Sequence, residues 1–242
     1  MPGYYKTEAV VLRSMRLREA DRIVHLYTRS RGQVGAVVKG VRRTRSRFGG
    51  RLEPFMRLRL VMYAGRGDLD TITQAEALEW HPKLRTRGAS LHMAGLACES
   101  VLRLFSDGES NEAAYNLLCR ELQLLDAHED VAGAANLLAF RLKLLLAAGF
   151  VPELSECVWC GADVAEAGVA GFSSAAGGVL CRACPRGDCM ALDERSRSFM
   201  AAALAAQLKD TPESNPSMLS QVDRAVTGTL EHHAHVSLRS VA

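Results

Sequence analysis

Two Cys-x-x-Cys pairs constrain this chain more than any other sequence feature. The first pair is Cys157 and Cys160, the second is Cys181 and Cys184, and twenty residues separate them. Two intervening residues let one tight turn direct both sulfurs toward the same ion, and two such turns at this separation are typical of a four-cysteine zinc ribbon. We therefore expect one structural zinc ion held by these four thiolates, with no open coordination position for catalysis.

The other cysteines leave a few alternatives open. Cys189 can replace Cys184 as the fourth ligand or stay free, and redox-active thiols are a second interpretation of the two pairs. The chain has 7 cysteines in all, an odd number that argues against a disulfide framework. A zinc deaminase would need a His-x-Glu element before its Pro-Cys-x-x-Cys, and the sequence has none.

Composition indicates a globular protein. Apolar residues make up 48% of the chain and charged residues 24%, which is ordinary for a folded domain. The sequence lacks the run of about 18 apolar residues that a membrane-spanning helix requires. Its first residues also lack the charged-then-apolar pattern of a secretion signal, so we expect a cytoplasmic protein.

Positive charge is concentrated in the N-terminal quarter. Residues 1–60 contain 15 Lys and Arg against 4 Asp and Glu, a balance of +11, whereas residues 61–242 contain 15 against 23, a balance of −8. A GC-rich genome would favour Arg over Lys, but it would not remove acids from the same sixty residues. The asymmetry favours a polyanion-binding module joined to a second part.

The densest part of this charge is residues 39–51, which contain six cations and no acid. The cations are Lys39, Arg42, Arg43, Arg45, Arg47 and Arg51. We expect them to contact nucleic-acid phosphates with little base preference, while Phe48 offers a face for a nucleobase. A solvated surface loop is the alternative. Eight other arginines can extend the patch, although a strand directs only alternate side chains outward. They are Arg13, Arg16, Arg18, Arg22, Arg29, Arg31, Arg57 and Arg59.

Apolar residues alternate with polar ones in short runs between residues 4 and 80, which predicts β-strands. The clearest case is residues 57–62, where Leu58 and Leu60 alternate with Arg57 and Arg59. About five strands separated by glycine-containing turns favour a small OB-like barrel, with a two-sheet sandwich as the alternative.

The apolar period becomes helical from about residue 84. Gly149 is typical of a helix C-terminus, and one later helix is expected to start after Asp193 and run to about Lys209. Another is expected to begin at Asn215, where a capping residue precedes Pro216.

These patterns predict an α+β multi-domain protein. We expect an OB-fold nucleic-acid-binding domain at 1–82, an all-α domain at 83–152 and 191–242, and a zinc-binding insertion at 153–190. Within the insertion, Phe172 and Val179 suit a short hairpin under the metal site. No Walker loop, nucleophile elbow or His-Glu-x-x-His motif is present, so we expect a binding protein rather than an enzyme.

Taken together, these segments resemble the RecO family of bacterial DNA repair proteins over essentially the whole chain. The most specific pieces are YKTEAVVL at 5–12, READR at 18–22, VKGVRR at 38–43, GGRLEPF at 49–55, CVWCG at 157–161 and GGVLCRAC at 177–184. The resemblance implies an OB-fold domain joined to a helical domain. It also implies zinc at the four cysteines and DNA contact by Lys39, Arg42 and Arg43, while Arg45 and Arg47 are added from charge alone.

The resemblance further implies a function and partners. RecO-like proteins bind single- and double-stranded DNA and anneal complementary strands without nucleotide hydrolysis. With RecR, they help place RecA on DNA coated by single-stranded-DNA-binding protein, whose acidic C-terminal tail they recognise through the helical domain. Two alternatives stay open from the residues alone: an OB-fold and zinc-ribbon factor acting on RNA or in transcription, and a nuclease with an unrecognised site.

Overall fold

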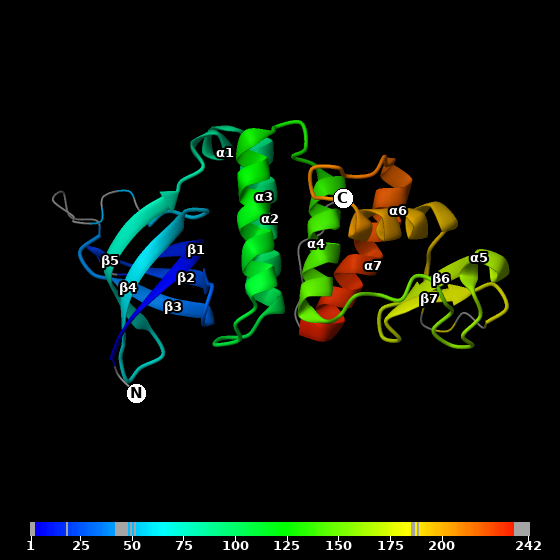
Figure 1. Ribbon diagram of the computed structural model, residues 1–242, viewed down its shortest axis with the longest axis horizontal. Coiled ribbons are helices and arrows are strands. Elements are labelled where there is room, and N and C mark those ends of the chain that lie inside the picture. The colour runs from blue at the N-terminus through cyan, green and yellow to red at the C-terminus, as the bar shows by residue number, and fades with distance from the viewer. Residues whose placement is uncertain are drawn as a thin grey trace. The chain divides into compact units, whose positions relative to one another are not determined.

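The computed structural model describes residues 3–17, 19–41, 48, 50, 52–184, 187 and 189–234. It divides into two compact units, residues 1–127 and residues 128–242. The first unit contains five strands and three helices in its described residues (Figure 1). The predicted division into three domains remains a prediction.

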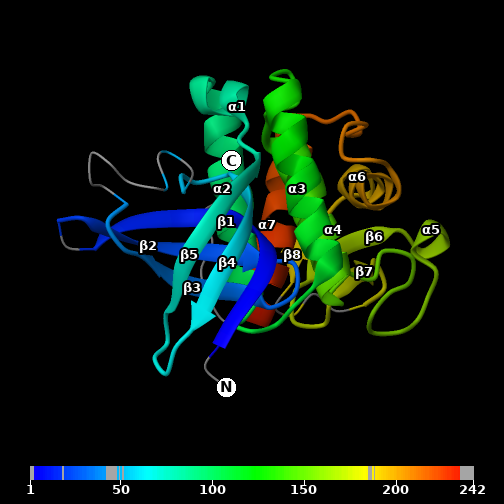
Figure 2. The same cartoon turned by 60° about the vertical axis from the view of Figure 1, so that its left-hand side comes forward.

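The strands of the first unit form a closed barrel in the order β1-β2-β3-β5-β4. They are β1 (Gly3–Leu17), β2 (Asp21–Thr28), β3 (Gly32–Val38), β4 (Arg57–Ala64) and β5 (Asp70–Glu79). All neighbours are antiparallel except β3 and β5, whose short parallel pairing completes the closure. Figure 2 shows the long β1 curving so that it borders both β2 and β4. The predicted OB-like barrel is confirmed, and the alternative of a two-sheet sandwich is excluded.

The alternation seen in the sequence explains which side chains fill the barrel. Leu58, Leu60 and Met62 point inward from β4 and are fully buried, as are Val24 and Leu26 on β2. The residues that alternate with these buried side chains on β4 face outward, and they include Arg57 and Arg59. At roughly 25 cal/mol per Å², burial of such side chains is the main favourable term in the folding of the barrel.

Three helices complete the first unit: α1 (Pro82–Thr86), α2 (Gly88–Leu104) and α3 (Glu112–Ala127). Gln33 on β3 fixes the end of α2, because its side-chain amide donates to the carbonyls of Val101, Leu102 and Phe105. Carbonyls at a helix C-terminus lack partners further along the helix, so a buried donor at this point satisfies them.

The second unit contains four helices and a small sheet in its described residues. They are α4 (Ala134–Ala148), α5 (Val164–Ala167), β6 (Val169–Ser173), β7 (Gly178–Cys181), β8 (Met190–Ala191), α6 (Glu194–Ala205) and α7 (Pro216–Ala234). Helices α4, α6 and α7 pack on one another, and the strands pair in the order β7-β6-β8. No described helix has both the length and the apolar character that crossing a membrane requires.

The helix ends follow the predicted capping residues closely. Gly149 adopts a left-handed conformation (φ 82°) after α4, and the side chain of Asn215 accepts a hydrogen bond from the Met218 amide at 3.0 Å. The helix predicted to reach about Lys209 is shorter and ends at Ala205. The carbonyl of Leu204 accepts a hydrogen bond from the Lys143 ammonium at 2.8 Å, so a side chain from α4 satisfies the end of α6.

Candidate nucleic-acid interface and metal centre

The basic segment begins directly after β3. Lys39 is the first of its cations, and the amide of Gly40 donates to the carboxylate of Asp21 at 2.8 Å, which fixes the start of the segment beside β2. The other predicted phosphate contacts lie outside the described residues. They are Arg42, Arg43, Arg45, Arg47 and Arg51.

Phe48 was expected to offer a face to a nucleobase, and the structure shows that this expectation is wrong. Its side chain is 2% exposed and belongs to the barrel core with Leu52 and Met56. An aromatic ring among arginines gains more from burial than from exposure to water. Phe48 therefore attaches the connection between β3 and β4 to the barrel.

Several of the arginines considered as extensions of the patch are already paired with acids. Arg22 lies 2.7 Å from Glu53, and Arg29 pairs with Glu112 on α3. Arg59 lies 3.0 Å from Glu76 on β5. Their charges are locally balanced, which weakens the case that they bind phosphate.

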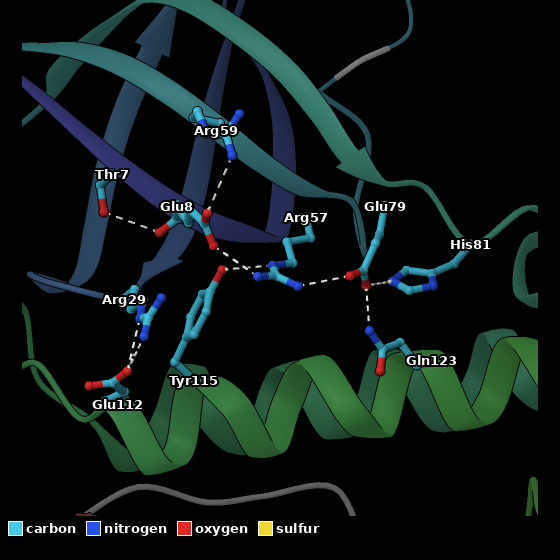
Figure 3. Close-up of polar contacts among 10 residues, drawn as sticks. All are labelled: Thr7, Glu8, Arg29, Arg57, Arg59, Glu79, His81, Glu112, Tyr115 and Gln123. Atoms are coloured by element: carbon cyan, nitrogen blue, oxygen red, sulfur yellow. Dashed lines mark hydrogen bonds and ion pairs between the residues drawn. The ribbon is translucent and has the colours of Figure 1, made fainter.

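Arg57 is the centre of the largest of these ion-pair clusters (Figure 3). Its guanidinium contacts Glu8 on β1 and Glu79 on β5, each at 2.8 Å, and also donates to the hydroxyl of Tyr115 on α3 at 3.2 Å. The hydrogen bond to Glu8 is the main reason why the pKa of Arg57 is raised above its ordinary value. Arg57 therefore connects β1, β4 and β5 to α3. These contacts correct the expectation that it extends the basic patch.

Other extension candidates differ from this group. Arg13 and Arg16 are exposed on the second half of β1, and neither makes an ion pair with any acid in the described parts of the chain. The guanidinium carbon of Arg31 lies 3.9 Å from the centre of the Tyr5 ring, and Arg18 lies outside the described residues. The described cations best placed to extend the basic segment are therefore Arg13 and Arg16.

The four cysteines that the sequence singled out lie together, with all sulfurs within 4.8 Å of one another. The Sγ atoms of Cys157 and Cys184 are 3.7 Å apart, and so are those of Cys160 and Cys181. A tetrahedral ion with metal–sulfur bonds of about 2.3 Å requires sulfur separations of about 3.8 Å. These two separations fit such an ion, and the four sulfurs lie close enough together to hold one metal ion.

Local backbone structure favours the thiolate form of Cys157. Gly161 has a φ of 71°, and its amide donates to the Cys157 carbonyl at 2.8 Å, which closes the first turn. Burial raises the pKa of Cys157, but donors from the Cys181, Trp159 and Cys160 backbone outweigh it and lower this pKa to about 6. The thiolate is the form that binds metal ions.

The surroundings of the cluster agree with the predicted hairpin. Phe172 on β6 faces Val179 on β7 across an antiparallel pair, and both side chains are fully buried. Cys189 lies against Gly171 on β6, and among the described residues it does not belong to the four-sulfur cluster.

The second unit also holds a cavity of about 450 Å³. Helix α6 supplies Arg195 and Phe199 to its lining, and Met218 comes from the first turn of α7. Neither the residue pattern nor the charge of the sequence pointed to this cavity, because its walls are brought together by the packing of α6 on α7.

Comparisons with known proteins agree with these features. The family model described as "Recombination protein O N terminal" matches residues 1–81, and the model described as "Recombination protein O C terminal" matches residues 85–242. A DNA repair protein RecO from Nocardioides is 37% identical over 240 residues, which are 98% of this chain and 98% of that protein. One from Rubrobacter xylanophilus is 46% identical over 181 residues, covering 74% of this chain and 71% of that protein.

Proposed function

Because the chain belongs to the RecO family of DNA repair and recombination proteins, we propose that it acts as a recombination mediator. It binds single- and double-stranded DNA and anneals complementary strands without nucleotide hydrolysis. With RecR, it places RecA on DNA coated by single-stranded-DNA-binding protein. We infer that no residue makes or breaks a covalent bond in this work, which takes place at the nucleoid in the cytoplasm.

The main support for this proposal is that an acid-free basic segment begins at Lys39, directly after a strand of a closed OB-like barrel. Annealing must overcome the repulsion between two polyanions. Cations on the barrel reduce this repulsion and raise the local concentration of strands, while base pairing supplies the free energy. Phosphate contacts carry no base code, so the protein serves strands of any sequence.

In this proposal the phosphate contacts are the six cations of the segment: Lys39, Arg42, Arg43, Arg45, Arg47 and Arg51. If about four to six of them contact a single strand, the slope of log affinity against log salt is about −3 to −4.

Cys157, Cys160, Cys181 and Cys184 hold one zinc ion, in accord with the sulfur separations of 3.7 Å. Zinc with four thiolates has no free coordination position, so its contribution is to stabilise the loops and the β6–β7 hairpin. Cys189 is not a ligand.

The cavity between α6 and α7 is a candidate site for the acidic tail of single-stranded-DNA-binding protein. Phe199 and Met218 give it an apolar wall, and its lining includes one cation, Arg195, which can pair with a peptide carboxylate, and one acid, Glu213. Binding of a synthetic acidic tail peptide, measured by calorimetry, is expected to weaken at least about tenfold in Arg195→Glu, since one charge contact at this site is replaced by a repulsion.

The proposed function is tested by strand annealing. Replacement of Arg42, Arg43, Arg45 and Arg47 by Ala is expected to slow annealing and to make the salt slope shallower by about 3. A control variant loses the same number of cations outside the barrel, at Arg103, Arg120, Lys209 and Arg224. Equal annealing by the two variants would refute the proposal.

A second assay separates DNA from RNA as the ligand and tests the partners. Competition of RNA against single-stranded DNA should favour DNA. Annealing of strands coated with single-stranded-DNA-binding protein, with and without RecR, then measures the mediator activity.

A further inference from the structure

Trp80 is an exposed tryptophan in the short junction between β5 and α1. Its side chain is 64% exposed, although it lies between a barrel strand and a helix that both have buried residues. Tryptophan is usually buried for most of its surface, and an indole this exposed leaves the face of its ring open to a ligand. Figure 1 shows β5 leading through this junction directly into α1.

The chain around Trp80 is basic. Residues 80–98 contain no Asp or Glu, while Lys83, Arg85 and Arg87 follow the tryptophan within seven positions. Lys83 is exposed, and both Lys83 and Arg85 lie in the last turn of α1. The stretch that follows Trp80 is therefore basic and free of acids, like the segment at 39–51.

Acids that border the junction already have partners. Glu79 pairs with Arg57 at 2.8 Å, and the carboxylate of Asp126 accepts a hydrogen bond from the Leu84 amide at 2.8 Å. A polyanion that approaches Trp80 therefore meets the exposed Lys83, while the charge of Glu79 is already balanced by Arg57.

The junction also touches the connection that contains the basic segment. The guanidinium of Arg85 donates to the carbonyl of Pro54 at 2.6 Å, and Pro54 lies three residues after the last cation of the segment, Arg51. The amide of Phe55 in turn donates to the carbonyl of Val11 on β1 at 2.8 Å. Helix α1 is thereby held beside the C-terminal end of this connection.

We propose that the junction is a nucleobase-stacking site for single-stranded DNA, in which Trp80 stacks on a base while Lys83 and Arg85 contact the adjoining phosphates. This inference rests on the proposed DNA binding, and the stacking contact of Trp80 itself depends on neither phosphate charge nor base identity. Indole stacking is tolerant of sequence, because every base has an aromatic face.

Stacking also suits annealing. A base held by its face keeps its pairing edge free for a complementary strand, whereas a base held by hydrogen bonds to that edge does not. Duplex DNA has its bases already stacked on one another, so Trp80 should contribute to single-strand binding and not to duplex binding.

The chain has 2 tryptophans, Trp80 and Trp159, and this makes a direct test possible. Trp159→Phe leaves Trp80 as the only indole, and Trp80→Phe leaves Trp159, which is 46% exposed in the second unit and serves as the matched control. Each variant is titrated with an oligo(dT) strand, while indole fluorescence reports stacking and the anisotropy of labelled DNA reports binding.

The expected result is strong quenching of fluorescence in Trp159→Phe and none in Trp80→Phe. An abasic oligonucleotide with the same number of phosphates should bind Trp159→Phe without quenching it. Trp80→Ala should weaken single-strand binding about tenfold, within the range found for one stacked base, and leave duplex affinity within about twofold. Trp80→Phe should restore most of the loss.

Two results would overturn the inference and leave the proposed function intact. One is binding of oligo(dT) by Trp159→Phe without quenching, and the other is an equal loss of single-strand and duplex affinity in Trp80→Ala. Absence of DNA binding by the unmodified protein would overturn the proposed function, and this inference with it.

Discussion

The guanidinium of Arg57 lies 2.8 Å from the carboxylate of Glu8, and this contact joins the first residue of β4 to the middle of β1 (Figure 3). The same guanidinium reaches Glu79 on β5 and Tyr115 on α3. An arginine that the charge pattern assigned to a DNA-binding patch is therefore part of the internal structure of the first unit.

Arg57→Ala is expected to lower the free energy of unfolding by about 1–3 kcal/mol, because Glu8 and Glu79 lose a partly buried partner. Arg57→Lys should recover only part of it, since an ammonium cannot reproduce the guanidinium geometry. Urea denaturation measures the stability. The salt slope of DNA binding should stay the same, and a shallower slope at unchanged stability would assign Arg57 to phosphate instead.

Gly32→Ala is expected to be costly. Gly32 has a φ of 60°, and a Cβ at this position would lie 2.0 Å from the carbonyl oxygen of Glu109, which is backbone and cannot move aside. We expect a loss of more than about 1 kcal/mol, measured by denaturant unfolding. Gly35→Ala is the control, because its Cβ meets only a methyl group of the Leu69 side chain. Similar stability for the two variants would contradict the expected clash with the Glu109 backbone.

The metal site predicts a difference between two cysteine substitutions. Cys160→Ser is expected to lower the zinc content well below one ion per chain and to destabilise the second unit, since a hydroxyl is a poor zinc ligand. Cys189→Ser should keep one zinc per chain. Metal content by mass spectrometry and thermal unfolding with and without a chelator test both statements. Loss of zinc from Cys189→Ser would place that residue among the ligands.

The burial of His81 leads us to expect that the free energy of unfolding depends on pH. It is 5% exposed, and burial lowers its pKa despite the opposing effects of Glu79 and Asp126, while Arg85 lowers the pKa further. The folded state thus favours neutral imidazole. Its contribution is complete above the unfolded pKa of about 6.5 and is lost as the pH falls below that value.

Unfolding in urea at about pH 7.5 and about pH 5.5, on either side of the unfolded pKa, measures this effect. His81 has a left-handed backbone (φ 47°) that Asn tolerates, so His81→Asn should reduce the difference between the two pH values. An unchanged difference in that variant would assign the pH dependence to other groups.

Local patterns in the sequence were sufficient for much of the fold. A period of two placed Leu58 and Leu60 inside the barrel, and Asn215 marked the start of a helix. The metal-site prediction rested on spacing alone, and the sulfurs of Cys157 and Cys184 do lie 3.7 Å apart. Each of these features depends on residues close together in the chain or on a fixed motif.

Features that depend on distant residues were not predictable in this way. Arg29 pairs with Glu112, which lies 83 positions away, and the carbonyl of Pro54 meets Arg85 across 31 positions. The burial of Phe48 depends on contacts with the barrel core that no local pattern encodes. Composition shows that cations are abundant, but only the three-dimensional register shows which of them already have an acid beside them.

The pairing of β3 with β5 has a consequence for the behaviour of this chain at high concentration. Every strand of the barrel is hydrogen-bonded on both sides, so the five strands form a continuous ring. Within the described residues the barrel therefore has no strand with a wholly unpaired edge, the feature that lets separate copies join strand to strand on a common route to irreversible aggregation. Copies of this chain can in this way reach a high local concentration with less tendency to aggregate through the barrel.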